Sequence, residues 1–296
     1  MNIITSTTEY SFSPSVVMLG KFDGVHLGHQ MLIKTGVEFS KKEKLSPVVY
    51  TFEGTNTECL TADDEKADIF SSLGAECVIF EKFTDEFKSI TPEVFVKDIL
   101  AGRLNAKHIV VGFNYRFGRG ASGDTELLQK LCDKLGIALT VIPPFEIDGT
   151  LVSSTHIRGL LSEGNVKGAN AFLGRPYTIS GVTAEGKGLG HKIGFATANI
   201  MGEFGKILPK RGVYVTKTHL NGEEYLSMTN VGVNPTVENI DTPKVETHLI
   251  DFAGEMYGKS IQIEFIDFIR DEKKFDSVGE LKSQLENDRK HVIKYF

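Results

Sequence analysis

The run from Gly20 to His29, GKFDGVHLGH, combines glycines and histidines at a spacing that suits phosphate binding. An apolar run that predicts a strand precedes it, and a helical pattern follows it. Glycines permit a tight backbone, and the first turn of a helix offers unpaired N–H groups and a positive dipole end to an anion. His26 and His29 can add hydrogen bonds to a polyphosphate that gains charge during displacement at its α-phosphorus. The segment therefore predicts a polyphosphate site.

Two alternatives remain open for this segment. One is a glycine-rich loop whose histidines have no chemical role. The other is a metal site, which is the weaker alternative because no third ligand stands nearby at a familiar spacing. Zinc sites use three or four protein ligands.

A second anion site is predicted in VSSTHIR, residues Val152–Arg158. Ser154 and Thr155 stand where a helix is expected to begin, and Arg158 falls within its first turn. Helix capping alone is the alternative explanation. Together with the histidine segment, this motif predicts a pair of facing phosphate clamps, because phosphoryl chemistry depends on positioning and charge.

The second half of the chain offers oxygen ligands. Its glycine-rich run, Gly186–Asn199, ends with the hydroxyl of Thr197 and the amide oxygen of Asn199. Such neutral oxygens can share a Mg²⁺ ion with the phosphates of ATP. Taken alone, the loop is explained more simply as a surface turn.

Glu246 lies in Val245–Phe252, an alternating run that predicts a strand. The alternation puts Glu246, His248 and Ile250 on one strand face and the intervening residues on the other. A solvated strand glutamate is the simplest explanation when the run is considered alone.

Strand and helix patterns alternate through the first half. Short apolar runs predict strands that are buried on both faces, and apolar spacings of three and four predict helices between them. This order is typical of a parallel α/β sheet, which binds ligands beyond the carboxyl ends of its strands. The expected strands are Val16–Leu19, Val48–Phe52, Cys77–Phe80, Ile109–Phe113 and Ala138–Ile142, and the expected helices are Met31–Phe39, Pro92–Leu100 and Thr125–Leu135.

The pattern changes near Pro143, after which two short helices lead to the stop at Gly174–Pro176. We place the domain boundary there, with domains over 1–174 and 175–296. Beyond it, period-two alternation predicts a small antiparallel barrel. The spacing of Ser277 and Glu280 indicates the start of a final helix, which we expect to pack on the barrel. The expected short helices are Ile157–Ser162 and Val166–Leu173, and the expected barrel strands are Val213–Thr216, Tyr225–Asn230, Val245–Phe252 and Ile261–Phe265.

Composition excludes several classes of protein. The 296 residues carry a formal net charge of −6 without a large Lys/Arg block, which disfavours nucleic-acid binding. Three widely spaced cysteines disfavour a disulfide framework and favour a reducing compartment. No run approaches the ~18 apolar residues of a membrane span, and no leader pattern is present. We therefore expect a cytoplasmic protein that binds neither nucleic acid nor membrane; the sequence does not reveal its oligomeric state.

The histidine segment and the SSTHIR segment together resemble the nucleotidylyltransferase superfamily. More narrowly, the chain resembles the bacterial family of bifunctional riboflavin kinase/FMN adenylyltransferases, also called FAD synthetases. The resemblance covers nearly the whole chain, and it implies a Rossmann-like nucleotidylyltransferase domain followed by a riboflavin kinase barrel. It rests on GKFDGVHLGHQ, VVGFNYRFGRGASGD, SSTHIRGLLSEG and FLGRPYTISG.

The resemblance implies that the first domain adenylylates FMN to FAD with ATP and releases pyrophosphate. His26, Gly28 and His29 would contact the ATP phosphates, with Mg²⁺ offsetting charge. Asn114 would help to place FMN. The other residues assigned to the ATP site on this basis are Gly20, Phe22, Asp23, Ser154, Thr155 and Arg158.

For the second domain, the resemblance implies phosphorylation of riboflavin to FMN. Thr197 and Asn199 would hold the Mg–ATP complex, and the loop with Gly186 and Gly188 would contact ATP. Glu246 would be the general base that takes the proton of the ribityl 5′-hydroxyl, a contribution of typically ~10²–10⁴-fold. The partners implied are ATP, riboflavin, FMN and FAD.

Three departures from the family pattern leave alternatives open. The family's T-F-x-P-H-P element is replaced by Thr51–Asn56, TFEGTN, and the proline of G-x-P-T-A-N is Ala196. The basic residues usual in the preceding loop are replaced at Leu189 and His191. One alternative is therefore a family member with a single working activity. Another is a flavin-binding regulator without turnover.

Overall fold

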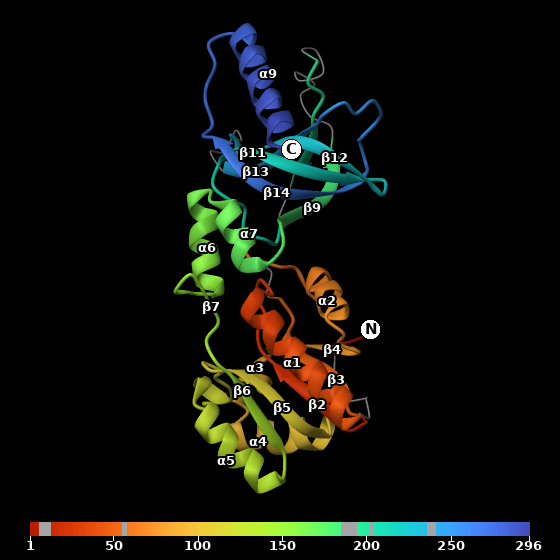
Figure 1. The fold of residues 1–296 in the computed structure, drawn as a ribbon, viewed down its shortest axis with the longest axis vertical. Helices are drawn as coiled ribbons and strands as arrows, with labels where there is room; N and C mark the ends of the chain where they lie inside the picture. The colour runs from red at the N-terminus through yellow and green to blue at the C-terminus, as the bar shows by residue number, and fades with distance from the viewer. Residues whose placement is uncertain (6–12, 55–57, 185–193, 202–203, 236–240) are drawn as a thin grey trace. The chain divides into compact units, whose positions relative to one another are not determined.

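A computed structural model describes residues 1–5, 13–54, 58–184, 194–201, 204–235 and 241–296 (Figure 1). The chain divides into two compact units, Met1–Ser154 and Thr155–Phe296. This division falls before the two short helices, whereas the boundary expected at 174/175 falls after them. Each unit has its own core, as the expected two-domain fold requires.

The first unit contains a six-stranded sheet in the order β1-β4-β3-β2-β5-β6, and every pair in it is parallel. The predicted parallel α/β architecture is confirmed. From β2 the sheet grows to one side through β3 and β4, and the chain then returns to add β5 and β6 on the other side of β2. The strand order therefore reverses between β2 and β5. The strands are β1 (Asn2–Ile4), β2 (Ser15–Leu19), β3 (Ser46–Phe52), β4 (Cys77–Glu81), β5 (Ala106–Gly112) and β6 (Ala138–Ile142).

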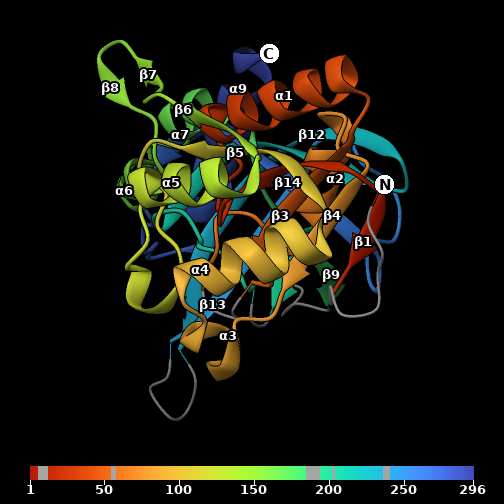
Figure 2. The ribbon, with the colours of Figure 1, turned by 90° about the horizontal axis from the view of Figure 1, so that it is seen from below.

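Helices cover both faces of this sheet, and Figure 2 shows α1 and α4 on opposite sides of it. Val16 and Met18 of β2 pack with α1 and α2, while Val17 and Leu19 pack with η1 and α5. Such two-sided burial explains the uninterrupted apolar sequence of β2. The helices are α1 (Leu27–Glu43), α2 (Asp63–Ser72), α3 (Asp85–Ser89), α4 (Pro92–Val94), the π-helix η1 (Phe95–Arg103), the short 3₁₀ turn η2 (Arg119–Ala121) and α5 (Thr125–Leu135).

Two expectations for the first unit were wrong in detail. Strand β6 is not buried on both faces, because it is the edge strand, and Ala138 and Val141 are exposed. The helix expected over Pro92–Leu100 is one turn of α-helix that continues as the π-helix η1. Periodicity did not separate these two helix types, since their apolar spacing is similar.

The second unit is a closed antiparallel barrel in the order β10-β13-β12-β11-β14-β9, as predicted. The strand expected over Val245–Phe252 ends at Leu249, because the chain turns there. The strands are β9 (Tyr177–Ala184), β10 (Ala198–Met201), β11 (Gly212–Leu220), β12 (Glu223–Pro235), β13 (Asp241–Leu249) and β14 (Ser260–Arg270), and a short hairpin of the first unit joins β7 (Glu146–Ile147) to β8 (Thr150–Leu151).

The inside of the barrel contains a network of hydroxyl groups. Thr216 contacts Ser227 at 2.8 Å and Thr229 at 2.7 Å, and Thr229 contacts Thr247 at 2.9 Å. All four residues are fully buried. These inward side chains are neutral and hydrogen-bonded to one another, as buried polar groups are in folded proteins. The charged side chains of the same strands lie on the outer face.

Helix α9 (Val278–Tyr295) covers part of that outer face (Figure 1). Ser277 caps it by accepting from the N–H of Glu280 at 3.2 Å. Val292 and Leu285 pack with Val215 of the barrel, so the expected packing of this helix is confirmed. Two further helices, α6 (Ser154–Glu163) and α7 (Val166–Leu173), precede the barrel. Among the helices of the described residues, none has the length and apolar character of a membrane span.

Candidate functional sites

The turn between β2 and α1 brings the two predicted histidines together. His26 is the N-cap of α1, and its Nδ1 accepts a hydrogen bond from the backbone N–H of His29 at 3.3 Å. The two rings stack with centroids 3.6 Å apart and planes at 16°. Because Nδ1 of His26 is an acceptor, its neutral ring carries the proton on Nε2 and can donate from there.

His29 has a ring nitrogen that the folded protein does not use. Its Nδ1 is shielded from solvent and has no hydrogen-bond partner among the described residues. Burial is the main cause that holds the pKa of His29 well below its ordinary value of 6.5, and electrostatic effects of His26 and of the Lys66 ammonium act in the same direction. Buried polar atoms without partners cost roughly 1–3 kcal/mol, so this nitrogen marks a place for a ligand with hydrogen-bonding groups.

The backbone of the turn is strained at non-glycine residues. The φ angle is 49° at Phe22 and 37° at Val25, on either side of Gly24 at 85°. Positive φ is uncommon for any residue with a side chain and rarest for a β-branched one. Strain of this kind concentrates at functional sites, where the surrounding structure imposes it.

The side chain of Phe22 lies in the core rather than at a ligand surface. Its ring is fully buried and meets the ring of His29 edge-on, with centroids 5.3 Å apart. A Cβ at Gly20 would lie 2.9 Å from that ring, and a Cβ at Gly28 would lie 3.4 Å from the ring of His26. Phe22 can therefore offer a nucleotide only its backbone, and both glycines leave room for the rings.

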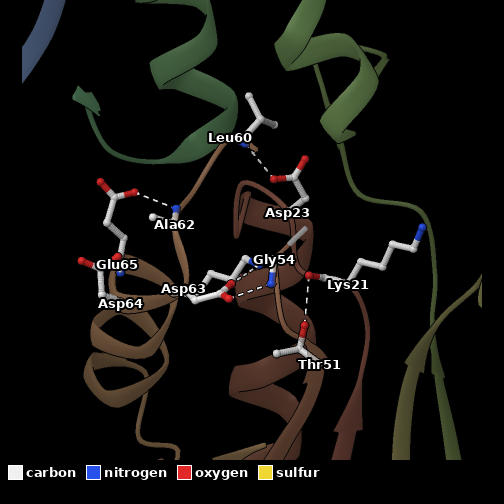
Figure 3. A network of polar contacts seen from close by, with 10 residues as sticks. Lys21, Asp23, Thr51, Gly54, Leu60, Ala62, Asp63, Asp64 and Glu65 are labelled. Carbon is white, nitrogen blue, oxygen red and sulfur yellow. Dashed lines mark hydrogen bonds and ion pairs between the residues drawn. The ribbon is translucent and has the colours of Figure 1, made fainter. Parts of the chain in front are cut away.

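Polar contacts tie the turn to its neighbours, as Figure 3 shows for Asp23, Leu60 and Thr51. Asp23 accepts at Oδ1 from the N–H of Leu60 at 2.8 Å, and its carbonyl accepts from the Ser154 hydroxyl at 2.8 Å. Thr51 donates to the carbonyl of Lys21 at 3.1 Å. Asp23 and Ser154 thus hold the turn in place through contacts with backbone groups.

Asn114 follows β5, and the histidine turn follows β2. These are the two strands between which the strand order reverses. Ligands of open parallel sheets bind at such a reversal, beyond the carboxyl ends of the strands. Asn114 is exposed there. Thr155 and Arg158 lie on α6 in the second unit, so their predicted approach to the imidazoles stays a prediction.

In the second unit, Thr197 and Glu246 line one cavity of about 310 Å³. The cavity lies on the outer face of the barrel, where Leu281 and Leu285 of α9 contribute to its wall. The side chain of Glu246 forms an ion pair with Lys244. The alternation predicted for this strand is confirmed, because Val245, Thr247 and Leu249 are buried in the barrel while Glu246 and His248 line the cavity.

Strand pairing places Asn199 directly opposite Glu246, with Asn230 opposite Glu246 on its other side. Opposed residues of antiparallel strands share a face, so the three side chains form one row. Asn199 is 2% exposed, and its Oδ1 has no hydrogen-bond partner among the described residues. A buried amide oxygen without a donor suits a hard cation.

His248 holds the segment that precedes Thr197. Its Nδ1 lies 2.8 Å from the carbonyl oxygen of Ala196, so the ring donates from this nitrogen. Burial lowers the pKa of His248, and the bond to Ala196 opposes that effect. The contact positions the segment in which Ala196 replaces the family's proline.

Arg270 also lines the cavity, although no chemistry was predicted for it. It binds Asp288 of α9 through Nε at 3.1 Å and Nη2 at 2.7 Å, and Asp288 is 2% exposed. Gln284 donates to the same carboxylate at 2.9 Å. Only its partner on α9 shows that this arginine is fixed at the cavity.

A second cavity of about 400 Å³ adjoins the first. Phe195 and His248 line both, and the second is completed by the residues after β13 and by α9. The predicted loop residues Gly186 and Gly188, together with Leu189 and His191, lie outside the described residues. So do Thr55 and Asn56 of the first unit.

Comparisons with known proteins agree with this two-part arrangement. A family model described as FAD synthetase matches residues 9–156, and one described as riboflavin kinase matches residues 173–296. The bifunctional riboflavin kinase/FMN adenylyltransferase of Bacillus subtilis is 36% identical over 295 residues, which cover 95% of this chain and 92% of that protein. The protein of the same description from Escherichia coli K12 is 34% identical over 309 residues, covering 100% and 98%.

A solved structure shares the complete fold. It is described as the crystal structure of a macrolide-efflux protein from Streptococcus pneumoniae and superimposes with a TM-score of 0.90 at 31% identity, covering 98% of this chain and 97% of that one. Its described activity belongs to that protein. The two family models and the full-length relatives agree with one another, and this chain belongs to the family of bifunctional riboflavin kinase/FMN adenylyltransferases.

Proposed function

We propose that the first unit adenylylates FMN and that the barrel phosphorylates riboflavin, each with ATP. One observation carries the proposal for the sites. Among the described residues, two buried side-chain polar atoms lack a hydrogen-bond partner, His29 Nδ1 and Asn199 Oδ1. One lies in each predicted site. Each atom matches the ligand expected there, a polyphosphate beside an imidazole and a metal ion beside an amide oxygen.

In the first unit, a phosphate oxygen of FMN attacks the α-phosphorus of ATP in line, and the bond to the bridging oxygen of pyrophosphate breaks. His26 and His29 hydrogen-bond to the phosphates of ATP while their charge increases. Gly20, Asp23 and Gly28 shape the turn that receives them. Ser154, Thr155 and Arg158 are proposed to act from the other side of the polyphosphate, and Asn114 is proposed to orient FMN.

In the barrel, the ribityl 5′-hydroxyl attacks the γ-phosphorus of ATP and ADP leaves. Glu246 accepts the proton of that hydroxyl, and Lys244 holds its carboxylate in place. Thr197 and Asn199 are proposed to hold Mg²⁺, which suits their oxygens. When bound, Mg²⁺ offsets the negative charge of the triphosphate. Gly186 and Gly188 are kept as proposed ATP contacts.

The two barrel cavities suit the two substrates. The cavity with Glu246 is assigned to riboflavin, because the base must meet the hydroxyl that it deprotonates. The adjoining cavity is assigned to ATP, with its phosphates directed toward Thr197. His248 and Phe195 line both cavities and stand between the substrates. A cytoplasmic location is retained as a prediction from the cysteine pattern.

The test is a pair of assays with purified protein, ATP and Mg²⁺, one starting from riboflavin and one from FMN. We expect FMN and then FAD from the first assay, and FAD with pyrophosphate from the second, as separated by chromatography. A protein with one working unit would form product in only one step. Flavin binding without any product would support a regulator instead.

A further inference from the structure

Two lysine–aspartate pairs of the first unit have the same geometry and opposite environments. Lys66 lies 2.9 Å from Asp63, and Lys88 lies 2.9 Å from Asp85, both at a spacing of three residues. The Lys88 side chain is 50% exposed, as expected of a surface pair, whereas that of Lys66 is 4% exposed. A buried ammonium is costly and is rarely retained without a partner or a role.

Helix α2 turns Lys66 toward the histidine turn. Phe70 is one helical turn beyond Lys66 and shares its face of the helix. The ring of Phe70 meets that of Phe22 edge-on at 5.5 Å, and Phe22 meets His29 at 5.3 Å. The charge of Lys66 is also one of the causes that lower the pKa of His29. The face of α2 that carries Lys66 and Phe70 is therefore the face turned toward the histidine turn.

The carboxylates near this face are directed at backbone groups. Asp23 accepts from the N–H of Leu60 at 2.8 Å, and Glu65 accepts from that of Ala62 at 3.1 Å. Asp64 accepts from the N–H of Glu65, as Figure 3 shows beside these two contacts.

Asp63 links Lys66 to the segment that departs from the family pattern. Its Oδ1 accepts from Lys66, and its Oδ2 accepts from the N–H of Gly54 at 2.7 Å. Figure 3 shows Asp63 beside Gly54. Gly54 stands where the family has the Pro-His-Pro element. A single carboxylate thus fixes both the ammonium and the start of that loop.

We propose that Lys66, on the face of α2 turned toward His29, is a phosphate-binding residue of the adenylyltransferase site, and that a phosphate takes the place of Asp63 beside its ammonium. This inference rests on the proposed function of the first unit. Its ligand is the polyphosphate of ATP and the pyrophosphate that leaves. The ammonium supplies the fixed positive charge that two neutral imidazoles do not provide, and charge-assisted hydrogen bonds to phosphate are the stronger class.

The test measures binding of inorganic pyrophosphate by calorimetry and the KM for ATP in FAD formation. Lys66→Met should weaken pyrophosphate binding and raise this KM by about 10- to 100-fold, the effect of losing a hydrogen bond to a charged group. Lys66→Arg should recover most of the loss. Lys88→Met is the matched control and should change neither quantity.

Asp63→Asn separates phosphate binding from a structural ion pair. Asparagine can still accept from Gly54, while Lys66 loses a competing carboxylate, so pyrophosphate should bind as tightly as to the parent protein or more tightly. Equal losses in Lys66→Met and Asp63→Asn, or an unchanged Lys66→Met, would overturn the proposal. Thermal unfolding and riboflavin phosphorylation check that both units fold. Absence of FAD formation in the parent protein would instead count against the proposed function.

Discussion

In the proposed function both units bind a triphosphate, and the two proposed sites present opposite kinds of atoms to it. The first unit presents a helix N-terminus, two stacked imidazoles and a buried ammonium, all of which suit an anion directly. The barrel presents the oxygens of Asn199 and Thr197 and the carboxylate of Glu246, which suit a cation and a proton. The difference follows from the chemistry proposed for each unit.

A phosphate nucleophile needs no base, whereas a hydroxyl nucleophile does. FMN reaches the first site already ionised, so that site needs only positive charge and alignment. Riboflavin reaches the barrel as an alcohol, and its hydroxyl must lose a proton. The comparison teaches that the chemical type of the buried atom without a partner, a ring nitrogen in one unit and an amide oxygen in the other, corresponds to the reaction proposed for each site. Variants that affect one unit and spare the other test this directly.

Glu246→Gln should have the largest effect. It removes the proposed base without changing shape, and we expect FMN formation from riboflavin to fall by about 10²–10⁴-fold. FAD formation from supplied FMN should stay unchanged. Glu264→Gln is the matched control, since Glu264 is also a half-buried strand glutamate with a polar partner, Nε2 of His219 at 2.9 Å. Full kinase activity in Glu246→Gln would remove the assignment of the base.

His29→Ala should impair FAD formation and spare riboflavin phosphorylation, and its effect should be somewhat smaller than that of Glu246→Gln. Loss of one donor to developing phosphate charge should lower FAD formation by about 10²–10³-fold while riboflavin phosphorylation is retained. His291→Ala, at an exposed position of α9, provides the control. If both activities of His29→Ala fell together, the two sites would not be independent, and the comparison would fail.

Asn199→Leu separates metal binding from folding. Replacing a buried oxygen that has no partner with an apolar group should leave thermal stability unchanged or increase it. The Mg²⁺ concentration for half-maximal FMN formation should rise by about tenfold, while that for FAD formation should not. An unchanged Mg²⁺ requirement for FMN formation would show that Asn199 does not hold the ion.

The smallest expected effect concerns pH and the stability of the first unit. Because the folded state holds the pKa of His29 below 6.5, the unfolded chain binds a proton that the folded unit does not as pH falls through that value. The first unit should therefore lose free energy of unfolding as the pH falls below 6.5, by at most about 1.4 kcal/mol per pH unit for this one proton. Urea unfolding at pH 7.5 and pH 5.5 measures this loss, and His29→Asn should reduce it.

Local sequence patterns determined much of the fold. Helical spacing placed α5 and a short apolar run placed β6 at their observed bounds, and period-two alternation placed the barrel strands near theirs. Glycines and histidines near a strand end indicated the edge of the sheet at which the first site is proposed. These features depend on residues that are close together in the sequence, so a local sequence pattern is enough to predict them.

The tertiary structure decided what depends on register and on distant partners. Strand pairing put Asn199 opposite Glu246, and α9 brought Asp288 to Arg270. Helix α2, which was not predicted, brought Lys66 toward His29. Sequence spacing does not show which strands pair or which face of a helix is covered, because both depend on packing between segments that are far apart in the sequence. The atoms that lack partners, which indicate the sites most directly, become visible only after that packing is known.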